Sequence, residues 1–323
     1  MQIKEQIKAE MNRRGSRGEP FIFLIDFLME EPQIFATDDS SPIILWQTPG
    51  AGNCRTSKKI NGLETWKPEP VSFENYKKGF DLVQQHIHSG DTYLLNYTQP
   101  SLVETNLSLE QIFHCSSAPY KILLKNQFVC FSPESFVKIE NGKIYSFPMK
   151  GTIDAGIENA GELILSDLKE QAEHNTIVDL IRNDLSRIST NVTVDKFRYL
   201  ERIHTNKNDL WQVSSKISAE LPEGYNRWLG DIIFSMLPAG SVSGAPKKKT
   251  VTIILKTENY DRGYYTGIFG YFDGKNLDSC VLIRFIENQN GRLIFKSGGG
   301  ITHMSIARDE YDELIKKVYV PIY

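Results

Sequence analysis

Apolar residues recur at helical spacing in several parts of the chain. The clearest case lies between Ser72 and Gly90, a residue favoured at helix N-caps and one favoured just beyond helix ends. Ser108 and Gln111 have the spacing of a capping box and predict a second helix. The strongest helical pattern runs over 161–188, and further helices are expected at 227–237, after Pro246 and at 305–318.

Strand patterns fill most of the remaining chain. Short strands and turns are expected from 21 to about 62, including 43–46. β-rich sequence runs over 122–153, and further strands are expected at 92–98, 267–272, 279–286 and 293–296. The chain contains neither an internal repeat nor a low-complexity linker. The pattern therefore predicts a single α+β domain, with antiparallel sheets covered by helices.

Composition narrows the environment and the class of partner. The 323 residues are 40% hydrophobic and 24% charged, with a formal net charge of −3, so no overall field attracts nucleic acid or an anionic membrane. The first twenty residues contain no signal-peptide pattern, and the apolar stretch from Phe21 is interrupted by Asp26. No two of the four cysteines have C-x-x-C spacing, and we expect all four to be free thiols. We expect a cytoplasmic protein that binds neither nucleic acid nor membrane.

Two pairs of glutamates have the spacing of one helical face. Glu170 and Glu173 lie in LKEQAEH, and Glu310 and Glu313 lie in DEYDEL. Such pairs are usually solvated, but two of them together would suit a hard divalent cation such as magnesium, which prefers oxygen ligands. The residues alone leave both interpretations open.

Two glycine-rich segments are candidates for anion binding. Gly298, Gly299 and Gly300 would let backbone N–H groups approach a ligand, although a flexible hairpin explains them equally well. Arg284 interrupts the apolar run VLIRF, which we expect to be a strand, and needs an anionic partner if it points inward. PAGSVSGAPKKK lacks the P-loop pattern, and its lysines 247–249 are expected to be solvated.

Glu134 in SPES and Lys150 in PMKGT are expected on neighbouring strands. A lysine beside a carboxylate is usually an ordinary ion pair. The catalytic alternative needs a desolvated, neutral and nucleophilic Lys150, with Glu134 acting as an acid.

Eight segments in a fixed order carry a resemblance to a known family. They are SPES, PMKGT, KEQAEH with IVDLIRNDLSR, PAGSVSGAPK, RGYYTGIFGY, IRF, GGGI and DEYDEL. In this order the chain resembles the chorismate-utilising enzymes over about 72–318. That family includes anthranilate synthase component I, aminodeoxychorismate synthase component I, isochorismate synthase and salicylate synthase. The resemblance implies two large antiparallel sheets with helices outside, a catalytic core at 72–323 and a shortened N-terminal region at 1–71.

The resemblance also implies roles for individual residues in binding chorismate. Magnesium is expected on Glu173 and Glu313, supported by Glu170 and Glu310. The enolpyruvyl carboxylate is expected at Arg284 and the backbone of Gly298 to Gly300, with Tyr265 nearby. Two further substrate contacts are expected from Thr152 and from Gln212, which replaces a histidine found in many relatives.

Lys150 favours the aminodeoxychorismate synthase branch, because relatives of the anthranilate synthase type have alanine there. By resemblance, Lys150 attacks C2 of chorismate while Glu134 protonates the departing 4-hydroxyl, and ammonia then adds at C4. Isochorismate and salicylate synthases have a lysine base where this chain has Leu94 or Leu95. Anthranilate synthase and a catalytically silent chorismate-binding subunit remain the alternatives.

The reaction implied by the resemblance needs two other proteins. None of the four cysteines lies between glycines as a glutaminase nucleophile would, so ammonia is expected from a glutamine amidotransferase partner. A separate aminodeoxychorismate lyase would release pyruvate from the product. The short N-terminal region argues against feedback control by tryptophan.

Overall fold

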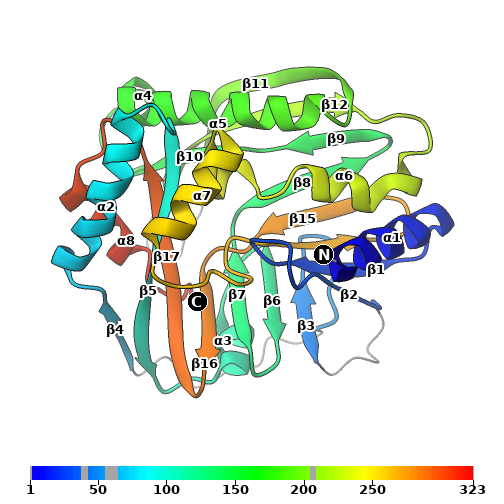
Figure 1. The fold of residues 1–323 in the computed structure, drawn as a ribbon, viewed down its shortest axis with the longest axis horizontal. Coiled ribbons are helices and arrows are strands. Elements are labelled where there is room, and N and C mark those ends of the chain that lie inside the picture. The colour runs from blue at the N-terminus through cyan, green and yellow to red at the C-terminus, as the bar shows by residue number, and fades with distance from the viewer. Residues whose placement is uncertain (1, 38–42, 55–64, 204–208, 323) are drawn as a thin grey trace.

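Two large antiparallel sheets form the centre of the molecule (Figure 1). The computed structural model describes residues 2–37, 43–54, 65–203 and 209–322. Its strands are β1 (Phe21–Ile25), β2 (Gln33–Phe35), β3 (Ile44–Gln47), β4 (Trp66–Pro70), β5 (Leu94–Thr105), β6 (Tyr120–Leu124), β7 (Phe128–Ser132), β8 (Ser135–Glu140), β9 (Lys143–Ser146), β10 (Met149–Asp154), β11 (Thr190–Ile203), β12 (Leu210–Glu220), β13 (Gly244–Ala245), β14 (Ile268–Phe272), β15 (Leu277–Val281), β16 (Phe285–Gln289) and β17 (Arg292–Ile301).

The first sheet has the order β10-β12-β9-β8-β15-β14-β1-β2, with β11 paired to β12. The second has the order β13-β5-β17-β16-β7-β6-β3, with β4 paired to β5. Strands β1 and β2 belong to the first sheet, and β3 and β4 belong to the second. The N-terminal region is therefore part of the same domain as the rest of the chain. The domain boundary at residue 71 stays a prediction.

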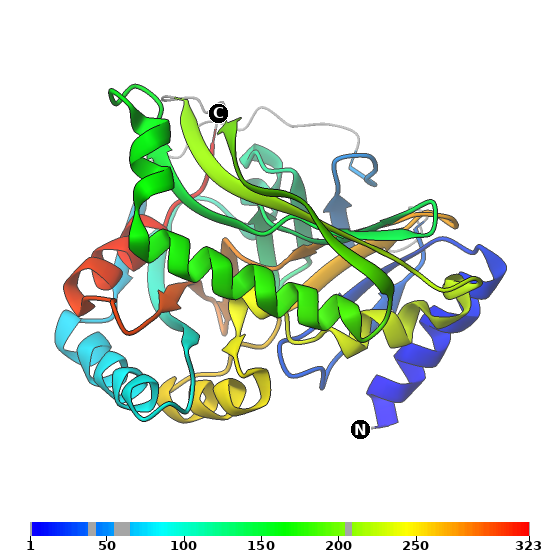
Figure 2. The same ribbon diagram turned by 90° about the horizontal axis from the view of Figure 1, so that it is seen from above.

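Helices cover the outer faces of the two sheets (Figures 1 and 2). They are α1 (Gln2–Arg17), α2 (Phe73–His88), α3 (Leu109–Cys115), α4 (Ala160–Ser166), α5 (Leu168–Ser186), α6 (Leu229–Ser235), α7 (Lys247–Thr257) and α8 (Ala307–Lys316), with short 3₁₀ turns η1 (Tyr225–Trp228) and η2 (Gly240–Val242). The predicted α+β class, with two antiparallel sheets inside a helical layer, is confirmed.

Strand β1 shows how the layers pack. All five of its side chains are buried, in alternate directions. Phe21, Phe23 and Ile25 join the core beneath α1, α5 and α6, whereas Ile22 and Leu24 join the core between the two sheets. A strand buried on both faces reads as a continuous apolar run, which explains FIFLI.

Local capping predictions are confirmed at two helices. The Ser72 hydroxyl accepts a hydrogen bond from the backbone of Asn75 at the start of α2. Ser108 and Gln111 form the predicted capping box of α3.

Two other local predictions are wrong, and one helix was not predicted. The segment 161–188 is two helices, because Asp167 adopts an extended backbone and caps Glu170. The strand expected at 279–286 breaks at Arg284, whose φ of 56° lies in the left-handed region. Helix α1 was not predicted, because its sequence has few apolar residues. Met11 joins the core with α6, and polar contacts from Asn12 to Gly230 and Asp231 add to this packing.

The lysine run is only partly solvated. The Nζ of Lys247 lies 2.6 Å from Asp184 Oδ2 and donates to the carbonyl of Met236, whereas Lys248 and Lys249 are exposed. Lys247 therefore differs from its two neighbours in being held by Asp184 of the facing helix α5 and by a backbone carbonyl.

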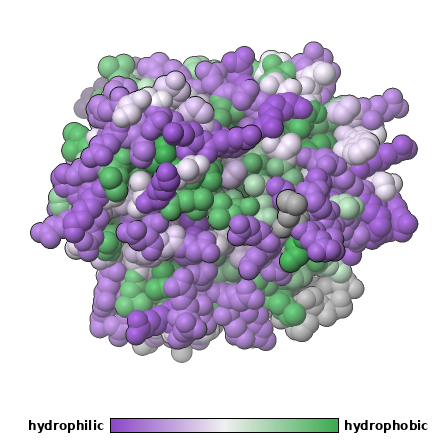
Figure 3. All heavy atoms as spheres, viewed as in Figure 1, coloured by the Kyte–Doolittle hydropathy of each residue, from purple (hydrophilic) through white to green (hydrophobic). Residues whose placement is uncertain are grey.

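The face shown in Figure 3 is largely hydrophilic, with hydrophobic atoms gathered in patches between the polar ones. Within the described ranges, no helix combines the length and the apolar character needed to cross a bilayer. No disulfide joins the four cysteines.

Candidate functional site

A large cleft opens where the β10 end of the first sheet faces β5 and β17 of the second. Its volume is about 1160 Å³, ample for a small organic substrate. Most of the residues predicted from the sequence line it: Glu134, Lys150, Thr152, Glu170, Gln212, Tyr265, Arg284, Gly298, Gly299, Gly300 and Glu313. Glu310 and Glu173 lie close to Gly299 and Gly300, on the side toward which a Cβ of these glycines would point. Segments far apart in the chain thus meet at one site.

The three glycines form part of a strand, where an anion-binding turn was expected. Gly298 to Gly300 belong to β17 and pair with Thr98, Tyr97 and Asn96 of β5. A Cβ at Gly300 would lie 3.2 Å from Glu173 Oε2 and 3.4 Å from Lys150 Nζ. The missing side chains therefore leave room in the cleft beside these charged groups.

The first glutamate pair projects from α5 into the site. Glu173 is 1% exposed, and its Oε2 lies 2.5 Å from Lys150 Nζ. Glu170 lines the cleft, and its buried Oε2 has no hydrogen-bond partner among the described residues. Burial raises the pKa of Glu170, and Lys150 opposes that rise.

The second glutamate pair projects from α8 and is matched by lysines. Glu310 Oε1 lies 2.6 Å from Lys169 Nζ, and Glu313 Oε1 lies 2.6 Å from Lys317 Nζ. Lys317 also donates to the carbonyl of Gly298. Both lysines were missed from the sequence, although each follows or precedes a glutamate at helical spacing.

We name the seven groups Glu170, Glu173, Glu310, Glu313, Lys150, Lys169 and Lys317 the cleft cluster. As arranged in the described part of the chain, no three acidic, histidine or cysteine side chains form a ready metal site. The carboxylate oxygens are nevertheless of the kind that magnesium prefers, and the unpartnered Oε2 of Glu170 fits an absent cation. Magnesium and its direct ligands remain predictions.

Lys150 reaches the cleft from an irregular point in β10. The pairing with β12 shifts between Lys150 and Thr152, and Gly151 between them has a φ of 73°. A Cβ at Gly151 would lie 3.1 Å from Glu170 Oε2. Although burial alone would lower the pKa of Lys150, the carboxylates of Glu173 and Glu170 raise it above its usual value.

Glu134 stands between β7 and β8 on another wall of the cleft. Strands β8 and β10 are not neighbours, so the expectation that Glu134 and Lys150 meet across adjacent strands is wrong, but both line the same cleft. The hydroxyl of Ser241 donates to Glu134 Oε1 at 2.5 Å. Burial raises the pKa of Glu134, partly offset by this hydrogen bond and by three nearby cations, Lys150, Arg284 and Lys317.

Ser241 was also missed from the sequence. It lies in η2, inside the glycine-rich segment that was considered only as a candidate for anion binding.

The remaining predicted substrate contacts lie around the same cavity. Thr152 pairs with Gln212 across β10 and β12, and the Gln212 amide donates to the Ser214 hydroxyl at 3.3 Å. Tyr265 is buried, and the guanidinium of Arg284 lies over the Tyr319 ring. Their contacts with a substrate remain predictions.

Comparison with known proteins identifies the family. The model of the chorismate binding enzyme family matches residues 37–322. The chain belongs to this family. The family match therefore supports a chorismate-converting enzyme, and the cleft is the candidate site for that substrate.

The relatives that this chain matches are named as different proteins. A Haemophilus influenzae protein named as an uncharacterized PabA-like protein is 50% identical over 314 residues, which cover 97% of this chain and 95% of the relative. Anthranilate synthase component 1 of Acetivibrio thermocellus is 33% identical, over 84% of this chain and 56% of its own length. Aminodeoxychorismate synthase component 1 of Bacillus subtilis is 32% identical, over 77% of this chain and 55% of its own length. The chain thus spans only about half the length of these two named enzymes.

A solved structure supports the fold. A Bacillus anthracis protein described as a putative 2,3-dihydroxybenzoate-specific isochorismate synthase, DhbC, aligns with a TM-score of 0.74 at 21% identity. The alignment covers 98% of this chain and 86% of that one, and at this identity it supports the fold alone.

Proposed function

We propose that this chorismate-binding enzyme adds ammonia to chorismate and forms 4-amino-4-deoxychorismate, as aminodeoxychorismate synthase component 1 does. The observation that carries the proposal is Lys150, whose amine shares one cleft with the Glu134 carboxyl. Identities of 33% and 32% to the two kinds of synthase do not choose between them. Lysine at this position is typical of aminodeoxychorismate synthases, and alanine of anthranilate synthases.

The charges of the cleft support a substrate with two carboxylates. Five basic residues line it against four acidic ones, although the whole chain has a net charge of −3; the basic ones are Lys150, Arg284, Lys296, Lys316 and Lys317, and the acidic ones are Glu134, Asp167, Glu170 and Glu313. Cations focused in a cleft attract an anion more strongly than the net charge would indicate. Arg284 and the glycine strand would bind one carboxylate, as the family resemblance implies.

The proposed chemistry has two steps. The Lys150 amine bonds to C2, the ring double bonds shift, and the C4 hydroxyl leaves as water with a proton from Glu134. Ammonia then bonds to C4, the double bonds shift back, and the C2 bond to Lys150 breaks. Covalent catalysis of this kind divides one difficult displacement into two easier ones.

The proton states of the two residues bear on these steps. The raised pKa of Glu134 favours the protonated form that an acid needs. The raised pKa of Lys150 means that its amine is protonated while Glu173 and Glu170 face it, so it must lose a proton before it attacks. Magnesium bound by the four glutamates would supply positive charge for the ring carboxylate and would compete with Lys150 for their oxygens.

Two alternatives are less well supported. Water addition at C2 would need a base near the substrate, and Leu94 lines the cleft at that position while Leu95 is buried in the core. A silent subunit would have no need to keep Lys150, Glu134 and both glutamate pairs around one cleft. We also propose a glutamine amidotransferase partner, a separate lyase and a cytoplasmic location.

Product identity tests the proposal. Purified protein is incubated with chorismate, magnesium and ammonium, with and without an aminodeoxychorismate lyase, and the products are separated by mass-resolved chromatography. We expect 4-amino-4-deoxychorismate alone, and p-aminobenzoate only when the lyase is present. Anthranilate without the lyase would instead identify an anthranilate synthase, and isochorismate would identify a water-adding enzyme.

A further inference from the structure

We propose that the buried ion pair of Glu258 and Arg262 is a positioning device for the cleft, which fixes Ser241 and Tyr265 and, through Ser241, orients the Glu134 carboxyl. We name these two residues the rear pair. The inference rests on the proposed function only for the role of Glu134 as an acid. Neither member of the rear pair lines the cleft.

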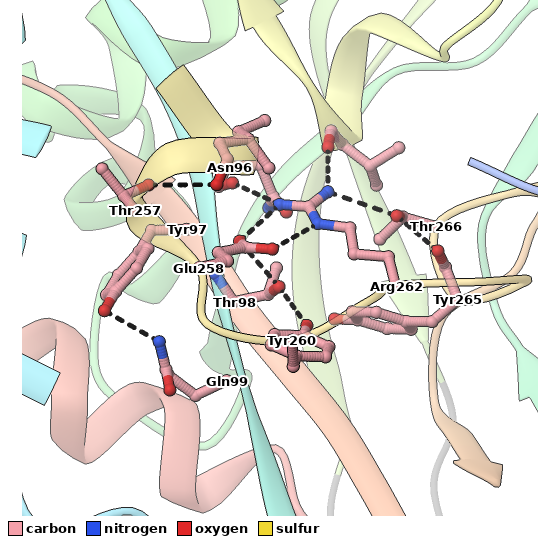
Figure 4. A network of polar contacts seen from close by, with 12 residues as sticks. Asn96, Tyr97, Thr98, Gln99, Thr257, Glu258, Tyr260, Arg262, Tyr265 and Thr266 are labelled. Carbon is pink, nitrogen blue, oxygen red and sulfur yellow. Dashed lines mark hydrogen bonds and ion pairs between the residues drawn. The ribbon is translucent and has the colours of Figure 1, made fainter. Parts of the chain in front are cut away.

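Arg262 is fully satisfied by its surroundings (Figure 4). Its Nε donates a hydrogen bond to Glu258 Oε2 at 2.8 Å, and its Nη2 donates one to Glu258 Oε1 at 2.7 Å. Its other three N–H groups donate to the carbonyls of Val242 and Asn96 and to the hydroxyl of Thr266. A guanidinium has five such donors in a fixed fork, so each has a partner here.

The contacts of Arg262 reach three different walls of the cleft. Asn96 lies in β5, Val242 ends η2, and Thr266 follows Tyr265 directly; Asn96, Val242 and Tyr265 all line the cleft. Glu258 adds a second tie to β5, because its Oε1 accepts hydrogen bonds from the backbone and hydroxyl of Thr98. Strand β13, which follows η2, already pairs with β5, and the rear pair adds the turn at Tyr265 and Thr266 to these two segments.

Backbone strain next to Tyr265 gives a second, independent sign of positioning. Thr266 has a φ of 62°, a conformation that β-branched residues rarely adopt. Its hydroxyl accepts from Arg262 and donates to the Tyr265 carbonyl, and its N–H donates to Leu282. Strain of this kind persists only where the surroundings fix it, and it clusters at functional sites.

Arg262 is linked to Glu134 through two neighbouring residues of η2. Arg262 binds the Val242 carbonyl at 2.9 Å, and the neighbouring Ser241 donates to Glu134 at 2.5 Å. If η2 moved, Glu134 would lose the one hydroxyl that orients it. A displacement of about 1 Å at a catalytic group can lower the rate about a hundredfold.

The test begins with Arg262→Lys and a matched control. Lysine keeps the charge but cannot satisfy the fork. We expect Arg262→Lys to lower kcat for chorismate about 10- to 100-fold, with KM changed less than about threefold, because the cleft cations stay in place. Asp278→Asn is the matched control: it breaks an ion pair with Lys138 outside the cleft and should leave both constants unchanged.

The pH profile separates positioning from mere stabilisation. The charged and titratable groups facing Glu134 are Lys150, Arg284, Lys317 and the Cys280 thiol, and none of them is altered. Losing the Ser241 hydrogen bond raises the pKa of Glu134, so the alkaline limb of kcat should move to higher pH in Ser241→Ala. Arg262→Lys should move it in the same direction, and the double variant should move it no further.

Each outcome decides the inference. A lowered Tm with an unchanged pH profile and kcat, or additive shifts in the double variant, would overturn it. Should Arg262→Lys fail to fold, Thr266→Ala removes a single hydroxyl from the same network and must show the same shift. Wild-type activity in Glu134→Gln would refute the acid assignment of the proposed function, while the change in kcat of Arg262→Lys would still test positioning.

Discussion

The cleft cluster and the rear pair are both sets of opposite charges, but only the rear pair is buried throughout, and the two differ in how completely their hydrogen bonds are satisfied. In the rear pair every N–H of Arg262 has an acceptor, and each oxygen of Glu258 accepts at least one hydrogen bond. In the cleft cluster, Glu170 Oε2 has no hydrogen-bond partner among the described residues. Lys150, which is 27% exposed in its side chain, is held mainly by one carboxylate.

This difference indicates a structural role for the rear pair and a role in ligand binding or catalysis for the cleft cluster. A fully satisfied buried pair fixes geometry, and removing one member leaves an unpaired buried charge. A partly satisfied cluster costs stability and is retained where a ligand completes it. We therefore expect substitutions in the rear pair to affect stability and geometry, and substitutions in the cleft cluster to affect mainly activity.

The largest effect on stability should come from breaking the rear pair. Glu258→Ala leaves Arg262 unpaired and should lower the free energy of unfolding by about 3–5 kcal/mol in urea titrations. Glu258→Leu with Arg262→Met removes both charges and should cost less than the single change. A double variant that is less stable than Glu258→Ala would contradict this account of the pair.

His174 tests whether partial satisfaction extends along α5. It is 1% exposed, and its Nε2 contacts the Ser215 hydroxyl while its Nδ1 has no hydrogen-bond partner in the described chain. Burial lowers the pKa of His174 from 6.5 to about 4. The unfolded chain therefore takes up this proton below pH 6.5 and the folded chain only below about 4.

The stability contributed by neutral His174 should thus be fully present above pH 6.5 and decrease as the pH falls from 6.5 to 4, by up to about 3 kcal/mol. Urea titrations with a chelator present, comparing wild type with His174→Gln, isolate this slope. Identical slopes in the two proteins would show that His174 does not titrate as described.

Glu170→Gln should show the opposite balance from Glu258→Ala. It removes a buried carboxylate with an unpartnered oxygen, so the free energy of unfolding should change by less than about 1 kcal/mol. Chorismate turnover should fall about 10- to 100-fold, and the magnesium concentration for half-maximal rate should rise. Glu162→Gln, on the exposed face of α4, is the control. Unchanged magnesium dependence would remove Glu170 from the proposed ligands.

The last comparison concerns two adjacent lysines outside both regions, one of which, Lys248, should give the smallest effect of all. Lys247→Met breaks the contact with Asp184 and should cost about 1–3 kcal/mol of unfolding free energy, since it leaves a buried carboxylate unpaired. Lys248→Met, at an exposed position, should change it by less than about 0.5 kcal/mol. Equal effects would contradict the burial assigned to Lys247.

The fold class and the caps of α2 and α3 could be predicted from the sequence, and most of the site residues predicted from it line the cleft. Helix α1 was not predicted because few apolar residues, chiefly Met11, and the polar contacts of Asn12 with α6 hold it, and so few apolar positions give no clear periodic signal. The break at Asp167 and the left-handed turn at Arg284 depend on local hydrogen bonds and strain that apolar patterns do not record.

Contacts between distant segments explain the rest of what was missed. Ser241 meets Glu134 across 107 positions, so no spacing rule links them. Glu258 and Arg262 stand four residues apart, but only the fold shows that they lie behind three walls of the cleft.

The most direct test of the central claim is the rate at which Lys150→Ala forms 4-amino-4-deoxychorismate from chorismate, ammonium and magnesium. Wild type and variant are compared at equal concentration, after chorismate binding by the variant has been verified. We predict a loss of at least about a hundredfold, because the variant has no nucleophile for C2. Formation of 4-amino-4-deoxychorismate by Lys150→Ala at the wild-type rate would contradict the account.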